Sequence, residues 1–513
     1  MVGGVPVAVG SPIREERNTV VALWNDLMVT SAAARRYSYQ EFSDFVRRFN
    51  QEALLFAVAR RALSLPPHLD GARIDRAYVA TPPWALAAVV KAVICHGNAH
   101  RRTLPRERDL LMACHMHANL ASDELGQPEL NSPFAILART AYEQFPYQES
   151  VMEEMSRSMA LFDDYSGRRA LEVVSKESMR ELIGAPMTTG VAIVIMLATA
   201  ADRNGGVFDP TWLSRKNFGP MLAVMPRDEI LAVVDSVFAC SMAEFRQEEA
   251  AARARTPLPY HDRYSFNPLT SRPFVRLADG RLLASVHQLI PRRLSPLELY
   301  YVGLRRWGDA FTRDLGELLE DYLGRQFGTL PDVSVHPEIV YREGREELKS
   351  VDWFLVFDDL VVLVEAKARR SPLAARAADA SAQREYTATL GKAFKQLGRT
   401  LDKIRAGAPE FAHIPTDRPI MGMVATLDPW YIANSFGRAF LPTPALPTIV
   451  ASVRDIEHLV GLGQRRPASG VLSEIMRAGD ERQTWELGTA LNGFREPADR
   501  NPLLMQAWER LPF

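Results

Sequence analysis

The sequence predicts an α/β module in its C-terminal half, with a central mixed sheet flanked by helices, joined to a large, mainly α-helical N-terminal domain. Three observations support this class. The chain has 513 residues, too many for one ordinary domain. Residues 14–255 repeat apolar side chains at spacings of three and four, which is typical of helices. Beyond that part, strand-like and helical segments alternate. We therefore expect domains at 1–260 and 261–455, and a helical extension at 456–513.

The composition is that of a globular protein, with 47% hydrophobic and 24% charged residues. A net charge of −1 excludes a global basic field, so a nucleic acid would have to meet a local patch. Three cysteines (Cys95, Cys114 and Cys240) argue against a disulfide framework. The longest apolar run, at 191–201, is too short for a membrane span. With no basic region of a signal peptide at its start, the sequence predicts a cytoplasmic protein without a membrane partner.

The elements can be assigned in order. Ser38 and Ser132 stand where helix caps are expected in the N-terminal half. RPFVRLADGRLLASVHQL predicts a hairpin that turns at Ala278-Asp279-Gly280. A helix ending at Gly328 should follow, then a strand VSVHPEIVYR. After the central hairpin described next, a helix REYTATLGKAFKQLGRTLDKIRAG and the strands RPIMGMVATL and ALPTIVASV complete the module.

The segment SVDWFLVFDDLVVLVEAKARRSP carries charges at both ends of an apolar run. If Asp358 and Asp359 form a two-residue turn, Asp352 lies directly opposite Glu365. Lys367 is two residues beyond Glu365 and so shares its face of the strand. Two carboxylates and one amine then meet at one end of the hairpin. A longer turn would shift this register.

Two facing carboxylates repel each other, which raises one pKa unless a cation compensates. Mg²⁺ binds one or two carboxylates together with waters and phosphate oxygens. Lys367 would then orient a water or stabilise charge on a phosphate. The chain has eight lysines among its 61 basic residues, and five of them fall between positions 349 and 403. The pattern predicts phosphodiester hydrolysis with Mg²⁺ or Mn²⁺.

Asp352, followed thirteen positions later by Glu365-Ala366-Lys367 after an apolar strand, resembles the PD-(D/E)xK nuclease superfamily. The resemblance covers about residues 300–430. It implies a restriction-endonuclease-like fold and a metal-dependent nuclease, with Asp352 and Glu365 as metal ligands and Lys367 as the catalytic lysine.

Two flanking segments extend the resemblance. LGELLEDYLGRQF is similar to the first core helix of Mrr-like and Holliday-junction-resolvase-like members, with Gly316 followed four residues later by Glu320. This implies Glu320 as a further metal ligand, although Glu317 competes with it. KAFKQLGRTL is similar to the helix after the E-x-K strand, where Gln396 matches an auxiliary catalytic residue.

Three features depart from the family pattern or leave it open. The residue before Asp352 is Val351, where many members have proline. Lys392 and Lys395 are alternatives to Gln396 as the auxiliary residue. A purely structural interpretation also exists, in which the aspartates cap a surface hairpin and Glu365 pairs with Lys367 at a strand end.

Basic residues around the hairpin predict a local phosphate-binding surface, formed by Arg369, Arg370, Lys392, Lys395 and Arg399. A solvated helix face explains them equally well, and nothing in the sequence is typical of base readout. The resemblance implies DNA as partner, with RNA as an alternative. It further implies a homo-oligomer and a restriction-like or phage-defence role. The competing hypothesis is a non-catalytic nucleic-acid- or protein-binding scaffold on the same fold.

Other polar groups predict less. CHGNAH and CHMH lack the C-x2-C spacing of zinc sites, so we interpret them as core cysteines and surface histidines. His287 is interpreted as structural. Thr426, Asp428 and Trp430 follow a strand end, where they would contact substrate or simply form a turn with Pro429.

Overall fold

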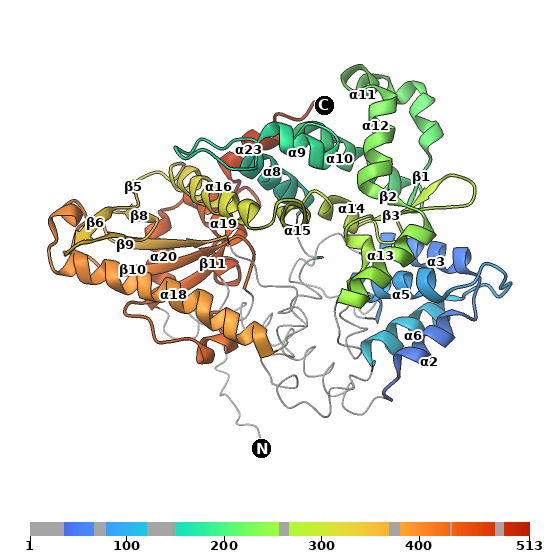
Figure 1. Cartoon of the computed structure of the whole chain (residues 1–513), viewed down its shortest axis with the longest axis horizontal. Helices are drawn as coiled ribbons and strands as arrows, with labels where there is room; N and C mark the ends of the chain where they lie inside the picture. Colours follow the sequence, from blue (N-terminus) through green and yellow to red (C-terminus); the bar gives the residue numbers. More distant parts are fainter. Residues whose placement is uncertain are drawn as a thin grey trace.

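The computed structural model describes residues 35–65, 78, 80–120, 147, 150–255, 266–368, 380–430, 433–477 and 487–512. Figure 1 shows the larger sheet with its helices on the left and a group of N-terminal helices with a small sheet on the right. The predicted combination of helices with a mixed sheet is confirmed.

The N-terminal helices form a small bundle. They are α2 (Tyr39–Val46), α3 (Gln51–Leu63), α5 (Pro83–His96) and α6 (Glu107–Ala118). The predicted cap at Ser38 is confirmed, because its side chain accepts a hydrogen bond from the backbone N–H of Glu41. Helix α5 is apolar on nearly all sides and lies buried among the others. The other predicted cap, Ser132, lies outside the described residues.

A small sheet follows, in the order β1-β4-β3-β2. Its strands are β1 (Val207–Phe208), β2 (Ala239–Cys240), β3 (Phe274–Arg276) and β4 (Leu282–Leu283). The predicted hairpin is β3–β4, and Gly280 has the positive φ of 87° that its turn requires. The sequence places this hairpin in the 261–455 domain, but it pairs with the N-terminal strands β1 and β2. Because both faces of these short strands are apolar, the sheet separates two cores.

The large sheet has the order β11-β10-β9-β8-β5. Its strands are β5 (Ser334–Pro337), β8 (Trp353–Val356), β9 (Val361–Lys367), β10 (Ile420–Thr426) and β11 (Thr448–Ser452). Strands β9, β10 and β11 are parallel, whereas β5, β8 and β9 pair antiparallel, so the sheet is mixed. The single strand expected at 333–342 is two strands: β5, and β6 (Val340–Glu343), which forms a separate hairpin with β7 (Glu346–Lys349).

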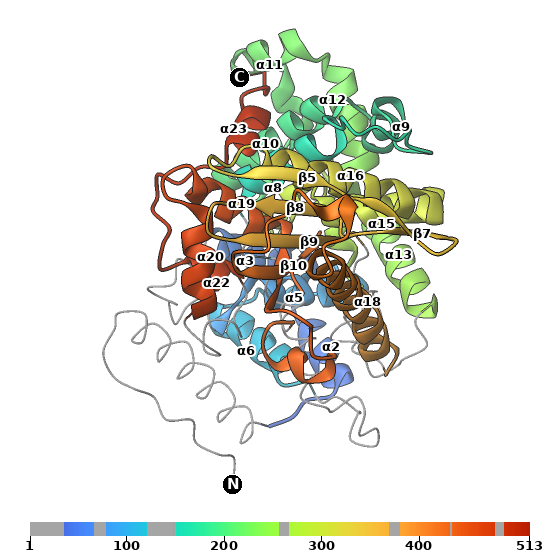
Figure 2. The same ribbon diagram turned by 90° about the vertical axis from the view of Figure 1, so that its left-hand side faces the viewer.

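Helices cover both faces of the large sheet (Figure 2). Alternate residues of β9 face opposite sides. Val362 and Val364 pack towards α16 (Asp309–Phe327) and α19 (Val453–Gly463), whereas Val361 and Leu363 pack towards α18 (Ala380–Arg405). The long helix expected before Gly328 is broken at Gly308, which has a φ of 58°, into α15 (Pro296–Trp307) and α16.

The N-terminal helix α8 (Val151–Phe162) shares one core with the large sheet and with the C-terminal helices α19 and α23 (Pro502–Trp508). At its centre, Arg157 of α8 donates two hydrogen bonds to Glu457 of α19, at 2.7 and 2.6 Å. The two side chains are 6% and 0% exposed. The hydroxyl of Tyr322 in α16 donates to the same carboxylate at 2.6 Å. The sequence boundary at residue 260 therefore does not separate two hydrophobic cores.

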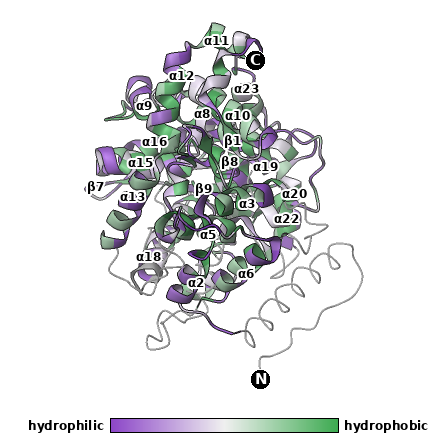
Figure 3. Ribbon diagram, turned by 90° about the vertical axis from the view of Figure 1, so that its right-hand side faces the viewer, coloured by the Kyte–Doolittle hydropathy of each residue, from purple (hydrophilic) through white to green (hydrophobic). Residues whose placement is uncertain are grey.

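One stretch, at 176–203, has the length and apolar composition to cross a membrane, but 56% of its most apolar window is buried in the fold. It consists of two helices, α9 (Lys176–Ile183) and α10 (Met187–Arg203), separated by Gly184 with a φ of 79°. Such a buried helix in a protein core meets the same criteria, so this is weak evidence for a membrane span. Figure 3 shows hydrophilic residues on outer helices such as α12 (Arg227–Val233) and α13 (Met242–Arg255).

We predict that Arg157→Met lowers the free energy of unfolding by about 3–5 kcal/mol, because it leaves the buried Glu457 carboxylate without its cation. Denaturant unfolding followed by circular dichroism measures this change. The matched control is Arg306→Met, which breaks an exposed ion pair with Glu181 at 2.7 Å and should cost less than about 1 kcal/mol. Equal losses in the two variants would contradict the central role of the buried pair.

Candidate functional site

The predicted register of the central hairpin is confirmed. The N–H of Phe357 donates to the carbonyl of Leu360 at 2.9 Å, which closes a two-residue turn at Asp358 and Asp359. Trp353 and Val364 are the last residues that pair, so Asp352, just before β8, and Glu365 of β9 both adjoin this pair at the same end of the hairpin. A shift of one residue would send Glu365 to the opposite face of the sheet.

Each of the two carboxylates has a different environment. The Oδ2 atom of Asp352 accepts a hydrogen bond from the backbone N–H of Ala366 at 2.6 Å. Glu365 is only 6% exposed, and its Oε1 atom lies 2.5 Å from the Nζ atom of Lys367. Its Oε2 atom is buried and has no hydrogen-bond partner among the described residues. A buried carboxylate oxygen without a donor is costly, so this atom is suited to a cation.

Helix α16 brings a third carboxylate, Glu320, to this end of the sheet. The indole Nε1 atom of Trp353 donates to the Glu320 carbonyl at 3.0 Å. The indole lies on Gly324, where a Cβ atom would come within 2.3 Å of the ring. This close approach fixes α16 against β8. By contrast, a Cβ atom at Gly316 would have no neighbour from another element within 4 Å. Packing therefore does not require glycine here, although Gly316 is the glycine that resembles the family's first core helix.

All three carboxyl groups have a raised pKa, and burial is the largest cause in each case. Burial, followed by the charge of Asp352, raises the pKa of Glu320 and of Glu365 to about 8 each. Burial raises the pKa of Asp352 to about 6, although the Ala366 N–H and the Lys367 charge oppose this change. The site therefore carries carboxyl groups whose ionised forms need an additional positive charge.

Sequence reasoning missed three charged neighbours of these carboxylates. Arg169, from the segment between α8 and α9, lies 2.5 Å from Glu317 and 3.9 Å from Glu338. Lys349 at the end of β7 also pairs with Glu338, at 2.7 Å. The charge of Glu317 is thus compensated, which favours Glu320 as the α16 residue of the site. Only Lys349 had a sequence signal, because it belongs to the lysine-rich stretch.

Gln396 does not reach the carboxylates as the family resemblance implies. Its Nε2 atom donates to the carbonyls of Lys349 and Ser350, both at 2.7 Å. It therefore holds the backbone that leads into Asp352. Next to it, the N–H of Val351 donates to Thr400 Oγ1 at 3.1 Å. Proline has no N–H, so it could not make this contact at position 351.

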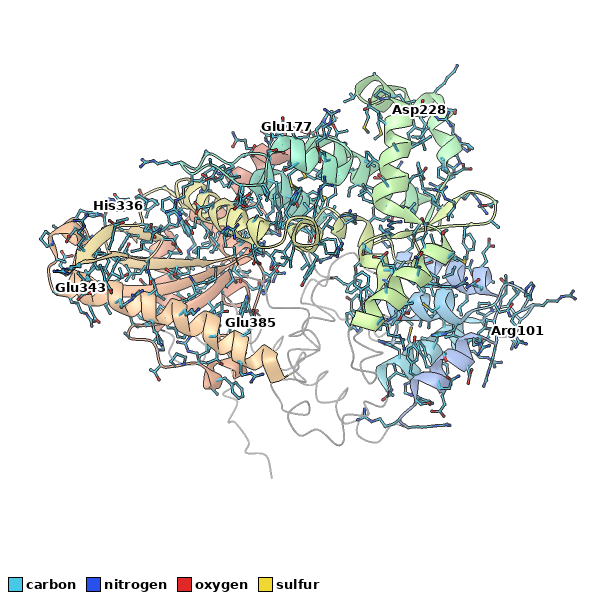
Figure 4. All side chains as sticks on the ribbon, viewed as in Figure 1. Arg101, Glu177, Asp228, His336, Glu343 and Glu385 are labelled. Atoms are coloured by element: carbon cyan, nitrogen blue, oxygen red, sulfur yellow. The ribbon has the colours of Figure 1, made fainter. Side chains whose placement is uncertain are left out.

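The predicted phosphate-binding residues lie partly within the described structure. Arg369 and Arg370 are outside the described residues. The other three predicted residues are exposed cations on the outer side of α18, and Arg384 is a fourth. We call this set the basic stripe: Arg384, Lys392, Lys395 and Arg399. Figure 4 shows the side chains of α18, including Glu385, and places Glu343 near the other end of the helix. Glu343 pairs with Lys403 at 3.1 Å.

The other polar and aromatic residues considered as substrate or metal contacts have structural roles where they lie in the described part of the chain. Thr426 is buried, and its hydroxyl donates to the carbonyl of Asp428 at 2.7 Å. Trp430 is buried and packs against Tyr386. Cys114 is a free, buried thiol, and burial raises its pKa to about 12.

Comparison of the chain with protein-family models, with curated proteins and with solved structures found no match. Within the described part of the chain, no three His, Cys, Asp or Glu side chains already stand together as a metal-binding group. Asp352 and Glu365 are instead held by Ala366 and Lys367. A cation at this site would have to compete with the Lys367 ammonium for Glu365.

We predict that the cation-free protein loses stability as pH rises from about 5 to about 8. The ordinary pKa of a glutamate is 4.5 and that of folded Glu365 is about 8, so the folded state keeps a proton that the unfolded chain releases. Since one pKa unit corresponds to about 1.4 kcal/mol, the loss should be a few kcal/mol. Thermal unfolding in EDTA at several pH values measures it.

Glu365→Gln cannot ionise and should make this pH dependence shallower, leaving the part that Glu320 and Asp352 contribute. The control Asp358→Asn, at the exposed turn of the same hairpin, should keep the slope of the wild type. The explanation fails if the two variants show the same slope.

Proposed function

We propose that this protein is a metal-dependent nuclease that hydrolyses phosphodiester bonds, with DNA as its substrate and RNA as the alternative. The observation that carries the proposal is the buried, unpartnered Oε2 atom of Glu365, opposite Asp352 and with Lys367 on the other carboxylate oxygen. Two strands and a helix converge here to bury negative charge that the described residues leave incompletely compensated. That arrangement is costly for stability alone, and a bound cation would offset the cost.

The donor set fits a hard divalent cation, because Asp352, Glu365 and Glu320 offer only carboxylate oxygens. Mg²⁺ or Mn²⁺ would activate water and polarise a phosphate oxygen when bound. Lys367 contacts Glu365 at 2.5 Å, so its ammonium lies close enough to the proposed cation site to stabilise charge that develops on the phosphate. Asp352 is kept in place by the Ala366 N–H, and Gln396 holds the backbone that precedes it.

The basic stripe on α18 supports a nucleic-acid substrate. Its members recur at helical spacing on the exposed side of the helix whose other side packs on the sheet. Contacts of this kind neutralise phosphates without reading bases. Cleavage of both DNA strands needs two sites, so the proposal includes a homo-oligomer, in a restriction-like or phage-defence role.

A second candidate is a non-catalytic nucleic-acid-binding scaffold. It is favoured by one observation, namely that Lys367 already occupies one oxygen of Glu365 while no three-ligand metal group is formed among the described residues. In that case Lys367 is a structural counter-ion and the basic stripe alone has a function.

We predict that the wild-type protein nicks or cuts plasmid DNA with Mg²⁺ or Mn²⁺, and that EDTA abolishes the activity. Asp352→Ala, Glu365→Ala and Lys367→Ala should each lower the rate at least about 100-fold, because each removes a group at the reacting centre. Gel electrophoresis of supercoiled DNA measures the rate. Asp358→Asn, at the far end of the same hairpin, should leave it unchanged. Equal nicking by every variant would reject the nuclease assignment.

We also predict that Lys392→Ala/Lys395→Ala weakens DNA binding and makes the slope of log affinity against log salt shallower by about 2, at roughly 0.9 per lost phosphate contact. Fluorescence anisotropy in EDTA at several salt concentrations tests this without cleavage. The matched control, Lys216→Ala/Arg227→Ala, removes two exposed charges beside α11 (Gly219–Val224) and α12, far from α18 (Figure 1). An equal change of slope in both variants would show that the basic stripe is not the binding surface.

A further inference from the structure

The segment at 164–174, between α8 and α9, lies along the outside of α16, and we call it the strap. Three acidic residues of α16, spaced at three and four, contact the strap: Asp314, Glu317 and Asp321. Residues at this spacing lie on one side of a helix. The strap is therefore held along a line that passes next to Glu320.

Both ends of the strap are fixed. At one end, the buried Asp314 carboxylate accepts hydrogen bonds from three consecutive backbone N–H groups, those of residues 172, 173 and 174, at 2.7, 2.7 and 2.8 Å. At the other end, Ser166 donates to Asp321 at 2.8 Å. Asp164 also pairs with Arg510 at 2.5 Å. A residue between these anchors is consequently held at a defined position on α16.

Arg169 is that residue. Its Nη1 atom lies 2.5 Å from Glu317 Oε1, and its Nη2 atom lies 3.9 Å from Glu338 Oε2. Glu317 is three residues before Glu320, so the two side chains are neighbours on the helix surface. Without a counter-ion, Glu317 could turn towards the same centre as Glu320. The guanidinium instead holds the Glu317 carboxylate towards the strap.

We propose that Arg169 is a positioning residue that keeps Glu317 out of the cation site and thereby sets which cation the site prefers. The inference rests on the proposed function, since it presumes that the carboxylates bind a divalent cation. Mg²⁺ uses few carboxylates and keeps several waters, whereas Ca²⁺ takes six to eight oxygen ligands. A site that Glu317 does not enter has fewer carboxylate ligands, which suits Mg²⁺. A site that gains Glu317 has one more carboxylate and suits Ca²⁺ better.

The test is calorimetric titration of the whole protein with CaCl₂ and, separately, with MgCl₂. Arg169→Ala should bind Ca²⁺ more tightly than the wild type, by on the order of fivefold, with a smaller gain for Mg²⁺. Arg169→Lys keeps the charge and should stay within about twofold of the wild type. The double variant Arg169→Ala/Glu317→Gln should return to wild-type Ca²⁺ affinity, because the carboxylate released by the first change is no longer present.

Two single variants serve as matched controls. Arg313→Ala breaks another strap contact, with Glu172 at 2.7 Å, and loosens the strap without removing the ion pair between Arg169 and Glu317. Arg168→Ala removes the adjacent exposed charge of the strap. Both should keep wild-type selectivity between Ca²⁺ and Mg²⁺.

The inference is overturned if Arg169→Ala leaves the Ca²⁺ affinity unchanged or weakens it. It is also overturned if either control shows the same gain, or if the gain persists in the double variant. A wild-type protein that binds neither Ca²⁺ nor Mg²⁺ would instead reject the proposed function itself. Binding by the wild type together with an unaffected Arg169→Ala variant rejects only the role of Arg169.

Discussion

The antiparallel pairing of β8 with β9 is the constraint on which the candidate site depends. Its two-residue turn brings Asp352 opposite Glu365 and leaves no freedom in the register. The flanking elements are aligned to this hairpin: α16 through the indole of Trp353, and α18 through Gln396 and Thr400. These contacts fix the backbone on both sides of the site, so Glu365 lies on a strand and Asp352 directly before one.

The hairpin could be predicted from the sequence because strand alternation and a short turn are local properties. The positions of Asp352, Glu365 and Lys367 followed from counting residues along it. Other parts depend on contacts between distant segments, which periodicity does not report. Arg169 reaches Glu317 across 148 positions. The apolar β3–β4 hairpin carried no signal for its partner strands. Nor did the sequence indicate that Gln396 donates to the backbone carbonyls of Lys349 and Ser350.

The buried pair of Arg157 with Glu457 changes how the N-terminal half is understood. Its burial would be unfavourable unless both partners and the Tyr322 hydroxyl were present together. Helix α8 is therefore a structural layer of the α/β part, and the strap continues from it to the carboxylates. The helices α2, α3, α5 and α6 pack in a different core, beyond the small sheet. A signal from them would pass through the shared core rather than across a flexible linker.

The shared core also has a consequence for dividing the chain. A fragment that begins at residue 261 would keep every proposed ligand, but it would lack α8, the strap and the cation of the central ion pair. The core of α16 and the large sheet would lose Met155, Met159 and Leu161 of α8, which would leave apolar side chains of that core exposed. Such a fragment would tend to aggregate. A domain library cut at composition boundaries would thus separate the candidate carboxylates from the layer that supports them, because α8 lies on the N-terminal side of that boundary.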